Sequence, residues 1–314
     1  MNLNGFINGK PMLEPPLLIE DLSPLPPNQV GLAVLGAPIK HSISPQIHSA
    51  ALRELSSGIP SFLNWVYHKV EVSSKDLASG LEHLNECGYR GLNLTIPHKV
   101  DVFSMIDSID QEARTIGAVN TLFHTGEEWR GFNTDGYGLE QALKGRLGVH
   151  LESANILILG AGGAARAAAA QSLSSGCENL WISNRSTERL ENMIDALGNS
   201  LDTARVVACP ISQLPAGVLD CGDLVIINAT SLGLNPGDPS PVSLRAFPPS
   251  TRVYDMIYNP AETPLLEEAR ARGMLCENGL SMLVHQAARS LEIWTGQEIS
   301  VEAMFSGAQT ALNC

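Results

Sequence analysis

Asn155-Ile-Leu-Ile-Leu159-Gly160-Ala-Gly162-Gly163-Ala-Ala165 is the stretch that decides the fold, because an apolar strand runs directly into a glycine-rich turn. An alanine-rich helix follows, so the pattern G-x-G-x-x-A stands between a strand and a helix. Gly160 allows a tight turn, Gly162 lets a pyrophosphate approach the backbone, and Ala165 keeps helix and strand close. The N-terminus of the helix would face the phosphates. The stretch therefore predicts a Rossmann-like domain that binds a dinucleotide.

The next strand of this domain, residues 179–183, runs into Asn184-Arg185-Ser186, and Arg189 follows. A site that prefers NAD usually places an acidic side chain at the end of this strand, whereas arginine accommodates the 2′-phosphate of NADP. Arg185 and Arg189 are spaced to share a helical face, and we expect Glu188 to turn outward. The sequence therefore favours NADP over NAD.

The N-terminal half alternates strands and helices. Residues 31–35, 64–72 and 92–96 have the patterns of strands, and residues 46–55 and 74–87 have helical spacing. This order predicts a mainly parallel sheet covered by helices, with ligands beyond the carboxyl ends of its strands. The predicted fold class is therefore α/β with two domains, an N-terminal α/β substrate domain and a Rossmann-like NADP-binding domain, with the active-site cleft between them.

Three parts are expected along the chain. Residues 1–30 hold six of the nineteen prolines, so we expect an N-terminal extension that resists regular structure and is extended, loosely packed or draped on a neighbour. Residues 31–134 plus 280–314 would form the substrate-binding catalytic domain. Residues 135–279 would form the NADP-binding domain.

Two serines precede the helical spacing of residues 46–55. The simpler interpretation is that Ser42 or Ser44 caps the helix, and the local sequence favours it. The functional interpretation is that two hydroxyls, two residues apart in an extended segment, point to one side and both donate to a carboxylate.

Polar residues also follow the later strands. Thr95 and Lys99 flank a strand-to-helix corner at Pro97, where the positive end of the helix dipole disfavours the ammonium form of Lys99. Asn120 and Asp135 follow β-prone pieces, although Asn and Asp beside glycine are more often ordinary turn formers. Their convergence with the serines on one rim predicts a binding site.

The composition excludes several classes of function. The formal charge is 20 − 33 = −13, which argues against a general nucleic-acid or anionic-membrane binder but not against a site for a small anion. The six cysteines form no C-x-x-C pair, and His41 and His48 have no carboxylate companion, so we expect no metal site. No apolar run approaches roughly 18 residues, and no secretory signal is recognised. We therefore expect a cytoplasmic protein.

Taken in order, the motifs from about Leu32 to the C-terminus resemble those of the shikimate dehydrogenase family, which also includes quinate dehydrogenases. The matching pieces are Ser42-Ile-Ser44, Asn93-Leu-Thr95-Ile-Pro97-His-Lys99, Gly117-Ala-Val-Asn120-Thr, Asn133-Thr-Asp135, Gly160-Ala-Gly-Gly-Ala-Ala165, Asn184-Arg185-Ser186, Asn228-Ala-Thr-Ser, Tyr254-Asp-Met-Ile-Tyr258-Asn-Pro and Gly279-Leu-Ser-Met-Leu. Ser186 stands where the family more often has threonine, and both residues supply a hydroxyl. The resemblance leaves the proline-rich extension unexplained.

The resemblance implies reversible NADP-dependent reduction of 3-dehydroshikimate to shikimate, in the pathway to chorismate and the aromatic amino acids. It implies that Lys99 and Asp135 form the acid–base pair. The substrate-binding residues that it implies are Ser42, Ser44 and Tyr258 for the carboxylate, and Thr95, Asn120 and Gln286 for ring hydroxyls. The cofactor-binding residues that it implies are Gly160, Ala161, Gly162, Gly163, Ala164, Asn184, Arg185, Ser186, Arg189, Met256 and Gly279.

Two alternatives remain open at this point. The first is a quinate dehydrogenase or a dual quinate/shikimate dehydrogenase, which can use NAD. The second, less favoured, is a non-catalytic NADP-binding regulator of the same fold. A small-molecule substrate is the expected partner, and a homodimer is the assembly considered, without nucleic acid or membrane.

Overall fold

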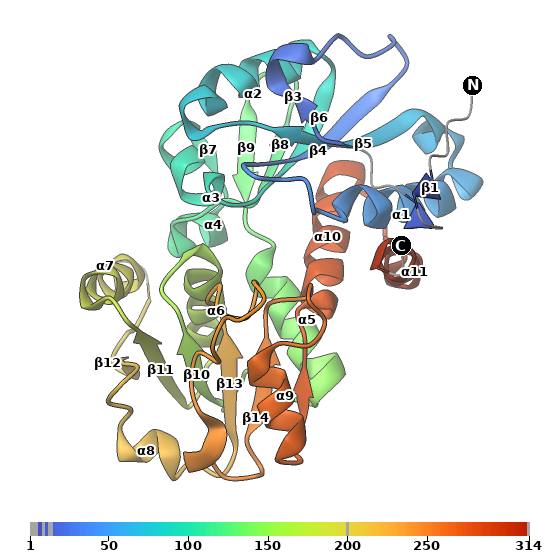
Figure 1. Cartoon of the computed structure of the whole chain (residues 1–314). Coiled ribbons are helices and arrows are strands. Elements are labelled where there is room, and N and C mark those ends of the chain that lie inside the picture. Colours follow the sequence, from blue (N-terminus) through green and yellow to red (C-terminus); the bar gives the residue numbers. More distant parts are fainter. Residues whose placement is uncertain (1–5, 8–9, 12–14, 199–200, 313–314) are drawn as a thin grey trace. The chain divides into compact units, whose positions relative to one another are not determined.

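The computed structural model describes residues 6–7, 10–11, 15–198 and 201–312, and the chain divides into two compact units (Figure 1). The first unit comprises residues 1–113, 118–134 and 286–314. The second unit comprises residues 114–117 and 135–285. The chain therefore leaves the first unit after Thr134 and returns to it at Gln286.

The second unit contains a six-stranded parallel sheet among its described residues, in the order β12-β11-β10-β13-β14-β15. Its elements are α5 (Asp135–Leu147), β10 (Asn155–Leu159), α6 (Gly163–Ser174), β11 (Asn179–Asn184), α7 (Thr187–Gly198), β12 (Val206–Pro210), α8 (Ala216–Leu219), β13 (Leu224–Asn228), a 3₁₀ turn (Leu244–Ala246), β14 (Arg252–Asp255), α9 (Pro264–Ala271) and β15 (Cys276–Glu277). Leu159 is in register with Ser183 on one side and Asn228 on the other, so three strands end at one edge. The parallel sheet confirms the predicted Rossmann-like fold.

The first unit contains a mixed sheet, with seven strands counted over the described residues, in the order β3-β5-β4-β6-β8-β9-β7. Its elements are β3 (Leu17–Leu18), β4 (Val30–Gly36), α1 (Ser44–Gly58), β5 (Trp65–Glu71), α2 (Leu77–Glu86), β6 (Tyr89–Leu94), α3 (His98–Asp101), β7 (Ser108–Ile109), β8 (Thr121–His124), β9 (Trp129–Phe132) and α11 (Val301–Leu312), with 3₁₀ turns at Ile19–Asp21, Pro60–Asn64, Ser74–Asp76 and Val102–Ser104. The β6–β8 and β8–β9 pairs are antiparallel and the other pairs are parallel. The sheet is therefore mainly parallel, as predicted.

Two helices run across the unit boundaries: α4 (Gln111–Ile116) and α10 (Leu280–Thr295). A short antiparallel pair, β1 (Phe6–Ile7) with β2 (Lys10–Pro11), precedes the sheet of the first unit. The remaining residues of the first fourteen lie outside the described part of the chain.

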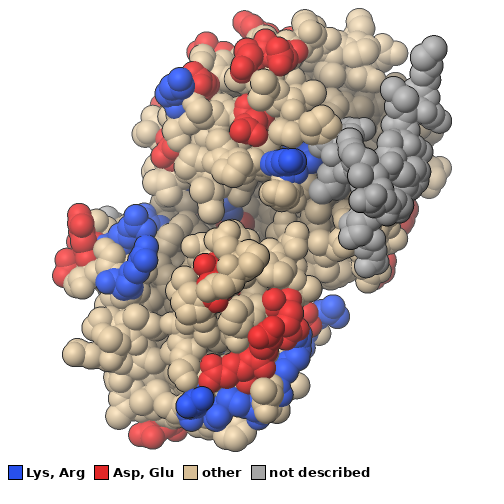
Figure 2. All heavy atoms as spheres, viewed as in Figure 1, with Lys and Arg blue, Asp and Glu red and all other residues tan. Residues whose placement is uncertain are grey.

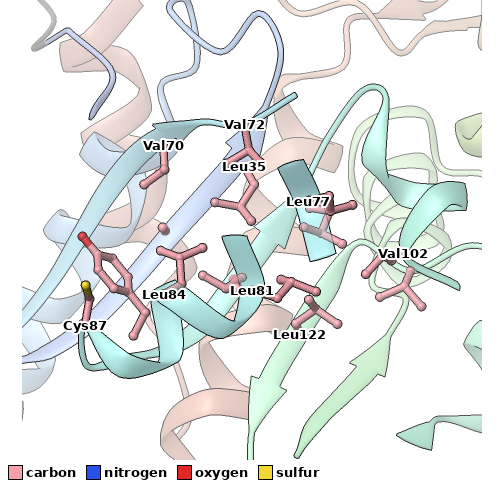
Figure 3. Packing of buried hydrophobic residues seen from close by; sticks show 14 of the residues in the cluster. Leu35, Val70, Val72, Leu77, Leu81, Leu84, Cys87, Val102 and Leu122 are labelled. Atoms are coloured by element: carbon pink, nitrogen blue, oxygen red, sulfur yellow. The ribbon is translucent and has the colours of Figure 1, made fainter. Parts of the chain in front are cut away.

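The hydrophobic core of the first unit fills the space between α2 and the sheet (Figure 3). Leu81 and Leu84 of α2 meet Leu35 of β4 and Val70 of β5, and all four side chains are buried. Burying each such side chain stabilises the fold by about 1.5–3 kcal/mol. The side chains of a strand alternate between its two faces. In β6 the residues on either side of Asn93 belong to this core, so Asn93 itself points to the opposite face of the sheet.

The described part of the proline-rich extension differs from the expectation of a segment without regular structure. Leu17 and Leu18 pair in parallel with β5 at the edge of the sheet. Leu25 donates its backbone N–H to the Cys87 carbonyl at 3.0 Å, and Ile19 packs against the hydrophobic core. Ile19, Leu22 and Leu25 are partly buried against the core, so this segment is draped along the first unit.

His48 of α1 is buried within an aromatic group of the first unit. Its ring stacks on Tyr67 with the centroids 4.0 Å apart, and Nδ1 donates to the Ser44 carbonyl at 2.9 Å. Burial lowers the pKa of His48 from 6.5 to about 4, because the charged imidazolium loses its hydration. The imidazole is therefore neutral at pH 7, which fits the expectation of a packing histidine.

This buried histidine predicts a loss of stability in mild acid. The unfolded chain binds the proton near pH 6.5 and the folded chain only near pH 4, so the stability is complete above pH 6.5 and falls as the pH drops below it. Between pH 7.5 and pH 5, His48 should cost about 2 kcal/mol of the free energy of unfolding. His48→Gln should lose about 2 kcal/mol less than the wild type over this interval, as measured by urea unfolding.

The matched control is His150→Gln, which changes an exposed histidine and should follow the wild type. Equal losses in the wild type and in His48→Gln would contradict the assignment.

Candidate active site

The serine pair lies where α1 begins. Ser44 is the first residue of α1, and Ser42 Oγ accepts its backbone N–H at 3.3 Å. Ser42 Oγ also donates to Ser44 Oγ at 3.1 Å, so the two hydroxyls lie side by side. The N-cap position itself is Ile43. The helix has no side-chain cap, so the capping interpretation does not hold for either serine. The adjacent hydroxyls fit the carboxylate interpretation.

Asn120 and Gln286 meet in the first unit although 166 residues separate them. Asn120 Nδ2 donates to Gln286 Oε1 at 3.3 Å. Asn120 Oδ1 accepts the backbone N–H of Thr134 at 2.8 Å and the Thr121 hydroxyl at 2.9 Å. Because a backbone N–H only donates, this contact fixes which end of the Asn120 amide is the oxygen. The fold thereby joins two residues that sequence spacing could not place together.

The strand-to-helix corner at Pro97 is present, but its helix is short. Pro97 occupies the N-cap of α3, which spans His98–Asp101, and Lys99 is half-buried in it. A four-residue helix aligns few peptide dipoles, and the chain turns into a 3₁₀ segment after Asp101. The role of Lys99 stays a prediction.

Backbone hydrogen bonds join the loops that carry these residues. The N–H of Thr95 donates to the Leu35 carbonyl at 2.9 Å, and the N–H of Val119 donates to the Lys99 carbonyl at 2.8 Å. The first bond ties the end of β6 to the end of β4, and the second ties α3 to the residue before Asn120. The predicted residues Thr95, Lys99 and Asn120 therefore lie in connecting segments, Lys99 within α3, that meet at one edge of the sheet.

Asp135 is the residue at which the second unit resumes after Thr134. It is the first residue of α5 and its side chain is buried. Lys99 belongs to the first unit and Asp135 to the second. The pairing of these two side chains therefore stays a prediction.

The glycine-rich turn has the conformation that the sequence predicts. Gly160 has φ +120°, and a Cβ on it would lie 2.9 Å from the Ala229 carbonyl oxygen. Gly162 is exposed at the N-cap of α6, where a Cβ would have no heavy atom within 4 Å, and Ala165 is fully buried against the sheet. Ala161, Gly163 and Ala164 are half-buried beside them. This open backbone at the N-terminus of a three-turn helix fits a pyrophosphate.

The two predicted arginines lie at the start of α7, and both are exposed. Asn184 Nδ2 donates to the Ser186 carbonyl at 3.1 Å, and Ser186 Oγ accepts the backbone N–H of Arg189 at 3.4 Å. These bonds hold the turn that separates Arg185 from Arg189. Glu188 is exposed too, and Figure 2 shows basic side chains gathered beside α7.

A third predicted part of the cofactor site is the turn after β14. The N–H of Gly279 donates to the Ile257 carbonyl at 3.1 Å, and a Cβ on Gly279 would lie 2.0 Å from the Met256 carbonyl oxygen. Only glycine allows the backbones of Met256 and Gly279 to lie this close together. Tyr258 follows in the same turn, and burial raises the pKa of its phenol, so it is a neutral hydrogen-bond donor at pH 7.

A buried carboxylate holds this turn, and the sequence analysis gave it no role. Asp255 is fully buried and accepts the Thr263 hydroxyl at 2.7 Å, the Asn228 amide at 3.0 Å and the backbone N–H of Ile257 at 3.0 Å. Burial raises the pKa of Asp255, and these hydrogen bonds act in the opposite direction. An acidic residue ending an apolar strand was the signal that could have found it.

Neither a cluster of metal ligands nor a membrane-spanning helix is present among the described residues. They contain no group of three or more His, Cys, Asp or Glu side chains that could hold a metal ion. No helix within the described ranges is both long and apolar enough to cross a membrane.

Three family models match the chain. The shikimate dehydrogenase substrate binding domain matches residues 34–122, the shikimate / quinate 5-dehydrogenase model matches residues 141–233, and the shikimate 5'-dehydrogenase C-terminal domain matches residues 279–304. These ranges include the serine pair, the glycine-rich turn and Gln286.

Full-length relatives are similar over most of the chain. A shikimate dehydrogenase (NADP(+)) of Geobacter metallireducens is 39% identical over 268 residues, which is 85% of this chain and 91% of the relative. The crystal structure of shikimate 5-dehydrogenase from Thermus thermophilus in complex with NADP(H) and shikimate is 33% identical, with a TM-score of 0.78, and the match covers 90% of this chain and 100% of that one. Quinate dehydrogenase from Corynebacterium glutamicum in complex with NAD is 25% identical, with a TM-score of 0.79, over 90% of this chain and 99% of that one.

The close approach at Gly279 gives a test of the dinucleotide site. In Gly279→Ala, the new methyl group would overlap the Met256 carbonyl, so the turn must shift. We expect dinucleotide affinity to fall at least about tenfold in a calorimetric titration, since backbone displacement costs more than about 1.4 kcal/mol.

The matched control is Gly222→Ala in the same unit, where a Cβ has no heavy atom within 4 Å. It should bind the dinucleotide like the wild type. Unchanged affinity in Gly279→Ala would show that this turn plays no part in binding.

Proposed function

Because the chain belongs to the shikimate dehydrogenase family, we propose that it catalyses the reversible NADP-dependent reduction of 3-dehydroshikimate to shikimate. This oxidoreductase step belongs to the shikimate pathway, which leads to chorismate and the aromatic amino acids. The observation that carries the proposal is the hydrogen-bonded Asn120–Gln286 pair, because it joins two predicted substrate residues from distant parts of the chain.

The substrate offers one carboxylate and several ring oxygens. The adjacent hydroxyls of Ser42 and Ser44 can both donate to the carboxylate, and the neutral phenol of Tyr258 is the third donor that we propose. Thr95, Asn120 and Gln286 would contact the ring hydroxyls. The first unit would thus be the substrate-binding catalytic domain, with the second unit as the NADP domain.

The residues of the glycine-rich turn fit NADP. The open backbone at Gly162 and the N-terminus of α6 would hold the pyrophosphate, while Arg185 and Arg189 would hold the 2′-phosphate. Met256 and Gly279 would border the nicotinamide. NADPH, when bound, supplies the hydride.

Lys99 and Asp135 are the acid–base pair of the proposal. Negative charge grows on the carbonyl oxygen as the carbonyl carbon is reduced, and an ammonium group stabilises that charge and supplies the proton. Asp135 would orient Lys99 and take part in the proton exchange.

The runner-up function is a quinate or dual quinate/shikimate dehydrogenase. The family model over residues 141–233 covers both activities, and a structurally similar quinate dehydrogenase was solved with NAD. Quinate carries an additional hydroxyl on the carbon that bears its carboxylate, so it needs more room beside the serine pair. The paired serines support shikimate instead, and Arg185 and Arg189 support NADP.

A cytoplasmic location is also part of the proposal. It is supported by the acidic composition and the unpaired thiols of the described cysteines, which suit a reducing compartment. The homodimer stays a prediction, and sedimentation of the full chain would decide it.

Kinetics with two substrates and two cofactors test the proposed function. We expect kcat/KM to be highest for shikimate with NADP, and at least about tenfold lower with NAD, because NAD lacks the phosphate that the arginines would bind. A preference for quinate would favour the runner-up. Shikimate binding without any turnover would favour a non-catalytic regulator.

Removing the amine tests the role of Lys99. Lys99→Ala should lower kcat by at least about a hundredfold with KM little changed, as expected for the loss of an acid–base group. Lys75→Ala, which changes an exposed lysine of the same unit, should keep normal kinetics. A near-normal kcat in Lys99→Ala would refute the assignment.

A further inference from the structure

Hydrogen bonds join the side chains at the ends of β13 and β14 in the second unit. Asn228 and Asp255 are neighbours in the register of the sheet, and both are fully buried. Asn228 Oδ1 accepts the backbone N–H of Thr230 at 3.0 Å, which fixes which end of the amide is the oxygen. Asn228 Nδ2 donates to Asp255 Oδ1 at 3.0 Å. The neighbouring strand therefore fixes the position of Asp255 Oδ1.

This oxygen of Asp255 holds one peptide group of the turn after β14. The backbone N–H of Ile257 donates to it at 3.0 Å, and no second acceptor for this N–H lies among the described residues. A trans peptide group is planar, so its N–H and its C=O point in opposite directions. The same peptide group carries the Met256 carbonyl. The bond from Ile257 to Asp255 therefore also sets the direction of the Met256 carbonyl.

The Met256 carbonyl is the part of this turn that lies against Gly279. Its oxygen is the atom nearest to a Cβ placed on Gly279, and the Ile257 carbonyl accepts the N–H of Gly279 at 3.1 Å. The N–H of Met256 belongs to the preceding peptide group, which the Asn228 carbonyl holds separately at 3.0 Å. Rotation of the Met256–Ile257 peptide group is therefore opposed by Asp255, and it would change the surface that Met256 and Gly279 present.

The two oxygens of Asp255 have different partners. Oδ2 accepts the Thr263 hydroxyl at 2.7 Å, and Thr263 is the N-cap residue of α9, where its Oγ1 accepts the backbone N–H of Leu266 at 3.4 Å. Oδ1 serves Asn228 and Ile257. One oxygen thus supports the start of α9 and the other supports the turn, so substitutions can separate the two roles.

We propose that Asp255 is a positioning residue of the dinucleotide site. Through Oδ1 it holds the Met256–Ile257 peptide group in the orientation that the nicotinamide half of NADP meets. A turn that is ordered before the cofactor arrives binds it without the cost of ordering. The inference rests on the proposed function for the identity of the cofactor and for the place of Met256 and Gly279 beside the nicotinamide. The hydrogen bonds themselves depend only on the fold of the second unit.

Asp255→Ala tests the proposal, because it removes the acceptor of the Ile257 N–H. Two probes are titrated into the ligand-free chain by calorimetry: NADP, and adenosine 2′,5′-bisphosphate, which lacks the nicotinamide half. We expect the Kd for NADP to rise at least about fivefold, the factor that corresponds to the loss of one hydrogen bond. The Kd for adenosine 2′,5′-bisphosphate should stay at the wild-type value, because the proposed function places no part of this probe beside Met256.

Thr263→Val is the matched control. It removes the donor to the other oxygen of the same carboxylate, and with it the side-chain cap of α9, so it should lower the melting temperature. Its Kd values for both probes should equal those of the wild type.

Asp255→Asn is the conservative variant. Its amide oxygen can accept from Ile257 and Asn228 while its amide nitrogen donates to Thr263 Oγ1. The Kd for NADP should therefore return to within about twofold of the wild-type value. A Kd as high as that of Asp255→Ala would contradict the role of Oδ1 as an acceptor.

Hydrogen exchange of the wild type supplies a test that does not depend on how the variants fold. If Asp255 holds the peptide group before the cofactor binds, the Ile257 amide of the ligand-free chain should exchange at least about tenfold more slowly than in an unfolded chain. Exchange at the rate of an unfolded chain would overturn the proposal.

Three results of the titrations would also overturn it. These are an unchanged Kd for NADP in Asp255→Ala, an equal loss of affinity for both probes in that variant, and an equal rise of the Kd for NADP in Thr263→Val. Failure of the proposed function is a separate result, because the wild type would then not bind NADP or not turn over shikimate. The exchange of the Ile257 amide would still decide whether Asp255 holds the peptide group.

Discussion

Parallel pairing of the central strands is the constraint on which both sites depend. Leu35 of β4 is in register with Leu94 of β6, and Leu159 of β10 is in register with Ser183 and Asn228. Strands that run in the same direction finish at the same edge, so the loops after them meet. The backbone bond from Thr95 to Leu35 then fixes two of these loops together. Backbone pairing thereby makes neighbours of residues that are far apart in the chain, and no contact between their side chains is needed.

In both units, the polar side chains buried beneath the candidate site are held by hydrogen bonds. Asn93 and Asn120 in the first unit and Asp255 in the second are almost fully buried, and each has several hydrogen-bond partners. A buried polar group without partners costs several kcal/mol, whereas a satisfied network holds its members in one orientation. Asn120 illustrates the consequence, because its oxygen accepts from Thr134 and Thr121, and its amide nitrogen donates to Thr134 Oγ1 at 3.0 Å and to Gln286 Oε1 at 3.3 Å. The orientation of this amide is therefore set by partners within the first unit.

Predictions from the sequence were least accurate where local and tertiary preferences compete. A helix was expected after Pro97, but the chain forms only His98–Asp101 before changing to a 3₁₀ turn. Residues 1–30 were expected to resist regular structure, whereas Leu17 and Leu18 within them form an edge strand. In both cases packing on the sheet decided the conformation, and no local pattern of prolines or helical spacing reports on that packing.

The sequence by itself determined the parts of this protein that depend on neighbouring residues. Strand periodicity, the left-handed turn at Gly160, the helix start after it and the arginines at and just before the start of α7 are all local, so a single stretch of chain specifies them. The tertiary structure alone decided that Gln286 meets Asn120 across 166 residues, and that Tyr67 of β5 bonds to Asn93 of β6. Such contacts depend on which strands pair and which helix covers them. The spacing of residues along the chain does not show which elements pack together, because burial and hydrogen bonding in the folded core decide it.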